Sequence, residues 1–186
     1  MNSSTFIRKN FRRTALASIV ALGAFGTSNS FAAEATTSAT GTVIVPIEIA
    51  NEFDLSFGKF APGAGGSVTI DTAGSRTGDG VILSSVDSSP AAAKFNVSGD
   101  NNATYGITWG GVDVMSETGE PTNTMALATF SDFTGGGGTT GDVALEGGTL
   151  SDTGAQSIYL GGTLTVGANQ AAGDYTGDVS VTVEYN

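Results

Sequence analysis

Short runs in which apolar and polar residues alternate recur along the chain from Thr42 onward, and no window keeps apolar residues at helical spacing. The clearest run closes the chain, where the alternation is unbroken over residues 178–185. Its apolar members are Val179, Val181, Val183 and Tyr185. A period of two places these side chains on one face of an extended strand. We therefore predict a final strand with that face in the core.

Similar runs fill most of the remaining chain. The first alternates Val43, Val45, Ile47 and Ile49 with other residues, and the further strand candidates are 53–57, 67–71, 80–84, 93–98, 104–109, 125–130, 156–160 and 164–166. Clusters rich in Gly, Asn and Pro separate them and predict turns, at 62–66, 99–102, 135–138, 147–148 and 161–162. We interpret the four glycines at 135–138 as a flexible loop tip. The pattern predicts an all-β fold, an antiparallel Greek-key sandwich of the immunoglobulin-like or pilin-like kind.

The first 32 residues have the organisation of an export signal. Arg8, Lys9, Arg12 and Arg13 precede an apolar run over residues 15–25, and the small-residue pattern Ser30-Phe31-Ala32 follows. A basic segment, an apolar segment and such a site are typical of a cleaved signal peptide. The apolar run is too short to span a bilayer. We expect cleavage after Ala32, passage through the periplasm to the cell surface, and one domain over residues 33–186.

Charge narrows the range of partners. Residues 33–186 contain Lys59, Arg76 and Lys94 as their only basic side chains, together with all eighteen carboxylates. The predicted exported chain therefore has an excess of fifteen negative charges. Such a surface repels phosphates and anionic membranes, so nucleic-acid binding is not expected. No transmembrane segment is expected after signal cleavage.

The composition offers little catalytic chemistry. The chain has no Cys and no His, which excludes disulfides and nucleophilic triads that depend on those residues. We predict no enzyme activity, no cofactor and no metal site. Two alternatives stay open at this point: a carboxylate pair acting on glycosides, and a sugar-binding platform of Trp109 with Tyr105 and Ile107. Solvated carboxylates and a sheet-face role are the commoner explanations of these residues.

The end of the chain resembles subunits assembled by the chaperone–usher pathway. In that family the last strand alternates, an aromatic residue is next to last, and a glycine is fourteenth from the end. Tyr185 and Gly173 occupy those positions here. The resemblance implies that the strand carrying Val179, Val181, Val183 and Tyr185 is gripped by a periplasmic chaperone and forms part of a groove. An outer-membrane usher is a further implied partner.

The N-terminal half carries a similar resemblance. The segment Thr40–Ile49, followed by a strand ending in Phe57-Gly58, is similar to pilins of the spore-coat-protein-U type. Over nearly all of residues 33–186 the sequence resembles the bacterial domain of unknown function 4402 family. The residues that carry this resemblance are Phe57-Gly58, Ser89-Pro90-Ala91, Leu160–Gly167 and Asp174–Gly177.

These resemblances imply a structural subunit of a surface filament or fimbria, assembled by β-strand addition and serving adhesion. Residues 33–50 would supply the donor segment, and Val43, Val45, Ile47 and Ile49 would fill pockets of the neighbouring subunit. Pro46 argues against this, because it removes a ladder hydrogen bond from the middle of the donor. The alternative is a self-contained secreted or surface sandwich with a binding or matrix role, in which residues 42–50 form its own first strand.

Overall fold

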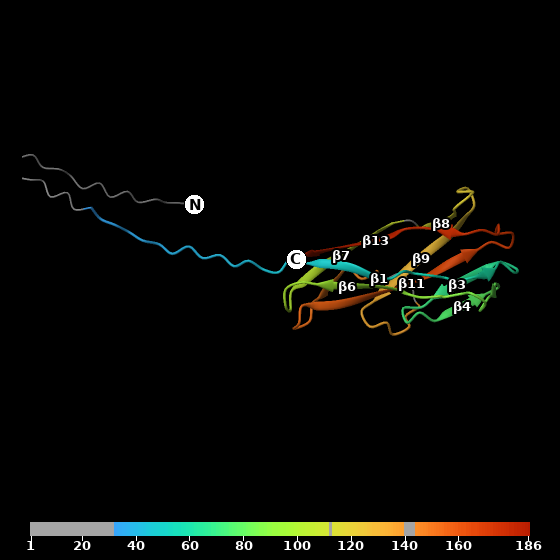
Figure 1. The fold of residues 1–186 in the computed structure, drawn as a ribbon, viewed down its shortest axis with the longest axis horizontal. Helices are drawn as coiled ribbons and strands as arrows, with labels where there is room; N and C mark the ends of the chain where they lie inside the picture. Colours follow the sequence, from blue (N-terminus) through green and yellow to red (C-terminus); the bar gives the residue numbers. More distant parts are fainter. Residues whose placement is uncertain (1–31, 112, 140–143) are drawn as a thin grey trace, which may run out of the picture. The chain divides into compact units, whose positions relative to one another are not determined.

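A computed structural model describes residues 32–111, 113–139 and 144–186 (Figure 1). The chain divides into two units, Met1–Gly41 and Thr42–Asn186. The described part of the first unit, residues 32–41, has no strand, and the predicted signal peptide lies outside the described residues except for Ala32. No helix long and apolar enough to cross a membrane occurs in the described part of the chain.

The second unit is built from strands alone within the described residues, which confirms the prediction of an all-β, antiparallel sandwich. The strands are β1 (Glu48–Phe53), β2 (Phe60–Ala61), β3 (Gly66–Ile70), β4 (Arg76–Asp79), β5 (Ile82–Leu83), β6 (Ala93–Ser98), β7 (Thr104–Gly111), β8 (Val114–Glu117), β9 (Thr124–Asp132), β10 (Gly147–Thr149), β11 (Ala155–Val166), β12 (Tyr175–Thr176) and β13 (Val179–Tyr185). The predicted strand 93–98 matches β6 residue for residue.

Two sheets of unequal size form the layers. The larger has eight strands, with β1-β6-β11-β9-β8-β12 in order, β3 joined to β11 and β4 joined to β3. The smaller has the order β10-β7-β13. Strand β11 is central, since its first half pairs with β6, its second half with β3, and β9 runs along its other side (Figure 1). A separate pair joins β2 to β5. Apart from the consecutive pairs β3–β4 and β8–β9, paired strands are not consecutive in sequence, so most pairings are long-range.

One end of the domain has a core enclosed between both sheets. Its buried members come from β6 and β11 of the larger sheet, from β7 and β13 of the smaller one, and from the loop after β10: Val97, Ile158, Tyr105, Ile107, Val183 and Leu150. The Tyr105 hydroxyl donates a 2.6 Å hydrogen bond to the Gln156 side chain. Burial raises the pKa of Tyr105 to about 12. The final strand points its apolar face into the domain as predicted.

The other end has no second sheet above it. Its buried residues Val68, Ile70, Met125, Leu127, Leu164 and Val166 lie on β3, β9 and β11, and Phe57 covers them. Further residues pack against this core from the loop after β1, from the short strands β2, β8 and β12, and from the start of β13: Leu55, Phe60, Met115, Tyr175 and Val179. A three-stranded sheet cannot cover the face of an eight-stranded one, so irregular segments complete this layer.

Two predicted turns are wrong. Gly161-Gly162 lies in the middle of β11, and Gly147-Gly148 lies in β10. A Cβ at Gly161 would come within 2.4 Å of the Phe130 ring, and one at Gly148 would come within 2.7 Å of the Tyr105 hydroxyl. These glycines are present because larger residues approach the strand there, and not because the chain turns.

The four-glycine run 135–138 is held by hydrogen bonds, contrary to the prediction of a loose tip. Thr72 is buried, and its hydroxyl donates to the Asp132 carboxylate and accepts from the backbone N–H groups of Gly137 and Gly138. Asp132 also accepts from the N–H groups of Thr134 and Gly135. This node fastens the loop after β9 to the turn after β3.

Candidate strand-binding groove

The smaller sheet has an open edge. Within the described residues, β13 pairs with β7 on one side and with no strand on the other. Its side chains alternate, with Ser180, Thr182 and Glu184 exposed. An unpaired edge of this kind presents N–H and C=O groups that a further strand can bind.

An apolar groove lies beside the start of this strand. Its larger hollow has a volume of about 700 Å³ and lies between two walls, residues 55–62 and residues 170–176. Side chains from three strands of the larger sheet line it between these walls: Met115, Met125, Leu164 and Val166. A second hollow, of about 380 Å³, shares Leu55, Phe57, Met115, Tyr175 and Thr176 with the first and extends to Val179. Together they form what we call the groove.

The groove exists where the second layer of the sandwich is incomplete. It lies over the loop-covered core, next to the first residue of the open-edged strand. An extended segment placed in it would lie next to Val179, the first residue of β13. Its apolar side chains would then reach the hollows left between the irregular cover segments.

Hydrogen bonds hold the first wall in place. Arg76, at the start of β4, donates through Nη1 to the carbonyl oxygens of Phe57 (3.0 Å) and Lys59 (3.1 Å) and through Nη2 to that of Ser84 (2.6 Å). The Lys59 N–H donates to the Ser88 hydroxyl at 2.9 Å. Gly58 has a φ of 67°, and a Cβ there would come within 2.7 Å of the guanidinium. The structure therefore explains why a glycine follows Phe57 in this chain.

The opposite wall is fixed by a tyrosine. Tyr175 donates its hydroxyl proton to the Ala171 carbonyl oxygen at 2.9 Å and accepts from the Gln170 amide at 2.8 Å. Its backbone pairs with Glu117 of β8. The wall is thereby connected to the edge of the larger sheet.

The predicted donor residues divide into two groups. Val43 is 99% exposed and Val45 is 54% exposed, and neither belongs to a strand. Ile47 and Ile49 are half-buried and pack on the chain's own core between the sheets. Ile49 lies in β1 opposite Val97 of β6. The strand begins two residues after Pro46, which has no N–H to contribute to a ladder.

The β1 pairing is reinforced on its exposed face. Glu52 forms a 2.8 Å ion pair with Lys94 and accepts a 2.7 Å hydrogen bond from Asn96, both on β6. Hydrogen bonding to Lys94 and Asn96 holds the pKa of Glu52 below its usual value. The sequence had left two roles open for residues 42–50, a donor segment or the first strand of the chain's own sandwich. The structure places Glu48–Phe53 in the larger sheet as its first strand.

The C-terminal residues singled out by sequence also divide. Val179, Val181, Val183 and Tyr185 face inward on β13, and Val179 lines the groove. Gly173 lies before β12, where a Cβ would meet the Glu117 side chain at 2.5 Å, and it lines the groove wall. The groove is thus lined by residues from the beginning and from the end of the domain's sequence.

Most groove residues gave no functional signal in the sequence. Met115, Met125 and Leu164 are ordinary core-type residues in a strand pattern, and Tyr175 stood only in a stretch that carried the family resemblance. They are recognisable as a group only after the strands are paired. Arg76 also escaped notice, although its being one of three basic residues in residues 33–186 was a usable signal.

Charge around the groove is mainly negative. Asp54, Asp174 and Asp178 belong to its lining, with Lys59 as the one basic residue in the two hollows. Residues 35–47 carry no charge at all. An uncharged apolar segment can therefore approach without the like-charge repulsion that other acidic parts of the chain would meet.

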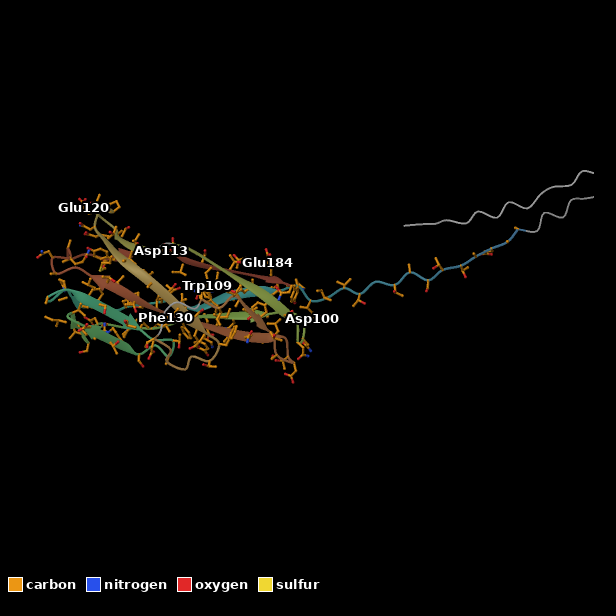
Figure 2. All side chains as sticks on the ribbon, turned by 180° about the vertical axis from the view of Figure 1, so that it is seen from behind. Asp100, Trp109, Asp113, Glu120, Phe130 and Glu184 are labelled. Atoms are coloured by element: carbon orange, nitrogen blue, oxygen red, sulfur yellow. The ribbon has the colours of Figure 1, made fainter. Side chains whose placement is uncertain are left out.

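The residues considered for other chemistry are placed differently. Tyr105 and Ile107 are buried, and Trp109 donates its indole N–H to the Leu145 carbonyl oxygen at 2.8 Å. No open aromatic platform forms from them. Figure 2 shows Asp100, Asp113, Glu120 and Glu184 spread around the domain. Within the described residues, no group of three carboxylates is placed to hold a metal ion.

The fold and the groove define the chain as an antiparallel β-sandwich whose smaller sheet has an open edge. The sequence model of the family described as "Domain of unknown function (DUF4402)" matches residues 47–185. The chain belongs to this family. The match begins at Ile47, one residue before β1, so the exposed Val43 and Val45 precede it. No curated protein is similar enough to count as a relative.

Proposed function

We propose that this protein is an exported structural subunit of a bacterial surface filament, assembled by β-strand addition between copies and serving adhesion. The observation that carries the proposal is the coexistence of an apolar groove with an exposed apolar segment on one chain. Val179, the first residue of the open-edged strand β13, lines the groove, and main-chain hydrogen bonds along an open edge can supply affinity. The predicted export signal supplies the route to the surface.

The donor in this proposal is the uncharged segment that ends at Ile47. Val43 and Val45 are exposed in the single copy, and burying an aliphatic side chain contributes about 1.5–3 kcal/mol. Such a contact between different surfaces does not close on itself, so it propagates as a filament. A periplasmic chaperone would occupy the groove before assembly, with an outer-membrane usher as the site of assembly.

Substitutions in the exposed segment test the proposal without disturbing the core. We would compare the chain from residue 33 with its Val43→Asp/Val45→Asp variant by chromatography with light scattering. The control is Ile82→Asp/Val86→Asp, since those residues are also exposed, at 66% and 70%. We expect ladders for the parent and the control, and a monomer of unchanged melting temperature for the Val43/Val45 variant.

Cross-linking locates the contact. The chain has no Cys, so a Val43→Cys copy mixed with an Ala172→Cys copy can form a heterodimer only through the introduced residues. Ala172 is exposed in the groove wall. We expect a disulfide-linked heterodimer from this mixture and little from Val86→Cys with Ala172→Cys. Equal yields from both mixtures would contradict insertion into the groove.

A self-contained secreted or surface sandwich with a binding or matrix role is the second candidate. Strand β1 pairs with β6 of its own chain, and the Glu52–Lys94 ion pair reinforces this pairing. Both observations favour the second candidate, because β1 is then not available to a neighbouring copy. A parent protein that stays monomeric at all concentrations, with no cross-link through residue 43, would select this candidate.

A further inference from the structure

Arg76 is unusual among the few basic residues of residues 33–186. In the described part of the chain Lys94 forms an ion pair with Glu52, whereas the Arg76 guanidinium has no carboxylate partner within salt-bridge distance. It donates instead to three carbonyl oxygens and to the Ser88 hydroxyl, at distances of 2.6–3.1 Å. A guanidinium has several donors in a rigid planar fork, which suits it to tie separate backbone segments together.

The segments that it ties together form one wall of the groove and the loop behind that wall. Phe57 and Lys59 line the groove, and Ser84 and Ser88 belong to the loop after β5. The Ser84 N–H also donates to the Lys59 carbonyl oxygen at 3.0 Å. The wall from Phe57 to Lys59 is thus irregular backbone whose polar groups are bound from behind.

Gly58 belongs to the same arrangement. A Cβ at this position would lie 2.4 Å from the Ser88 hydroxyl oxygen and 2.7 Å from the Arg76 Nη1 atom, in addition to the strain of a positive φ. Only glycine lets the guanidinium approach the backbone this closely. The Phe57-Gly58 pair and Arg76 therefore act as one unit, with the Phe57 side chain directed to the core below the groove.

We infer that Arg76 is a positioning residue for strand binding: it holds the wall Phe57–Lys59 in the conformation that accepts an uncharged, apolar, extended segment of a second copy. This inference rests on the proposed function. Removing the guanidinium frees the Phe57 and Lys59 carbonyl groups, and the wall then has alternatives to the conformation that leaves the groove open. The peptide would then bind only the fraction of molecules with the wall in place, so its apparent affinity would fall.

The test measures binding and stability separately. The acceptor is the monomeric Val43→Asp/Val45→Asp chain, and the probe is a fluorescent peptide of residues 38–47, followed by anisotropy. Arg76→Lys keeps the charge but cannot reach the same four acceptors, and Arg76→Met removes the charge. Ser88→Ala is a milder variant that removes a contact shared by Arg76 and the Lys59 N–H.

A matched control separates positioning from general destabilisation. Val97→Ala lies in the core between the sheets and outside the groove lining, so it lowers the melting temperature without touching the wall. We expect the Arg76 variants to bind the peptide about tenfold or more weakly than Val97→Ala, with a smaller loss for Ser88→Ala. Faster amide exchange at residues 57–59 should accompany the loss.

The outcomes are distinguishable. If the Arg76 and Ser88 variants bind the peptide as tightly as Val97→Ala, the positioning role is wrong while strand binding stands. If the parent acceptor itself fails to bind the peptide and the cross-link through residue 43 is absent, the proposed function fails and this inference fails with it.

Discussion

The hydroxyl of Tyr185 donates a 2.8 Å hydrogen bond to the carbonyl oxygen of Val45, from the next-to-last residue of the chain to the segment that precedes β1. The Tyr185 hydroxyl oxygen in turn accepts a 2.6 Å hydrogen bond from the Asp100 N–H in the turn after β6. One phenol therefore connects three segments at the end of β13. It fixes the point at which the N-terminal segment enters the domain.

Tyr185→Phe removes both hydrogen bonds and leaves the Asp100 N–H without its partner. We expect the free energy of unfolding to fall by about 1–2 kcal/mol, since an unmade bond at a partly buried group costs that much. Chemical denaturation measures the change. Tyr159→Phe is the matched control on the outer face of β11, and an equal loss there would show that the Tyr185 contacts contribute nothing specific.

The two groups of predicted donor residues should respond differently to truncation. Ile49→Ala removes a side chain that packs on the core between the sheets, so we expect a loss of about 1–2 kcal/mol in unfolding free energy. Val43→Ala changes an almost fully exposed residue, so its effect should stay within about 0.5 kcal/mol. Equal losses in monomeric protein would contradict the placement of β1.

Gly161→Ala tests the close packing of β11. The added methyl group would meet the Phe130 ring and the Ile70 carbonyl oxygen, so we expect destabilisation by about 1–3 kcal/mol. Gly119→Ala is the control, because a Cβ there has open space around it. Thermal melts of the two variants should differ clearly, and matching melts would show that the strand relaxes around the new side chain.

Thr72→Val tests the node that holds the loop after β9. The variant keeps the shape of the side chain but removes the hydrogen bonds to Asp132, Gly137 and Gly138. We expect a loss of about 2–3 kcal/mol and faster amide exchange at residues 134–138. Thr72→Ser retains the hydroxyl and should recover most of the protection. Unchanged exchange in Thr72→Val would mean that the loop is held by other contacts.

The Asp132 carboxylate should make the free energy of unfolding depend on pH in the acid range. Burial alone would raise its pKa, but hydrogen bonds from Thr72, Gly135, Thr134 and Gly136 outweigh burial and lower the pKa below 3.8. A lowered folded-state pKa gives stability that is present above the unfolded-state value and is lost as pH falls through the folded-state value. The parent should therefore lose unfolding free energy below about pH 4 more steeply than Asp132→Asn. Asp152→Asn, a change at an exposed carboxylate, should follow the parent.

The same sign applies to Glu52, whose pKa is lowered by the hydrogen bond to Lys94 first and to Asn96 second. The stabilisation that ionised Glu52 contributes is also present at neutral pH and is lost as the carboxylate is protonated in acid. The Asp132→Asn comparison keeps Glu52 unchanged, so the difference between the two acid profiles reports on the Asp132 node alone.

Local alternation predicted the longer strands well. The final strand, β6 and β9 were found because a period of two survives in any partly buried strand. The short strands β8 and β12 were missed, because two to four residues carry too little pattern. The glycine pairs in β10 and β11 predicted turns that the structure does not have, since a glycine that makes room for a neighbouring ring is identical in sequence to one that makes a turn.

The candidate site was less predictable than the strands. Sequence resemblance drew attention to Val43–Ile49 and to Tyr185, but alternation alone could not tell that Ile49 pairs within its own copy while Val43 is exposed. Most of the groove lining could not be recognised as a group, because it comes from several distant segments. Arg76 acquires a role only through four acceptors that lie 8 to 19 residues away in the chain.

By itself the sequence determined the class of fold, the strong negative charge and the absence of cysteine and histidine chemistry. These follow from local periodicity and from composition, which need no knowledge of which strands pair. The tertiary structure decided where the second layer stops, because that depends on an eight-stranded sheet facing a three-stranded one. The groove lies where the smaller sheet stops, and the open edge of β13 and the acceptors of Arg76 are likewise set by contacts between segments distant in sequence.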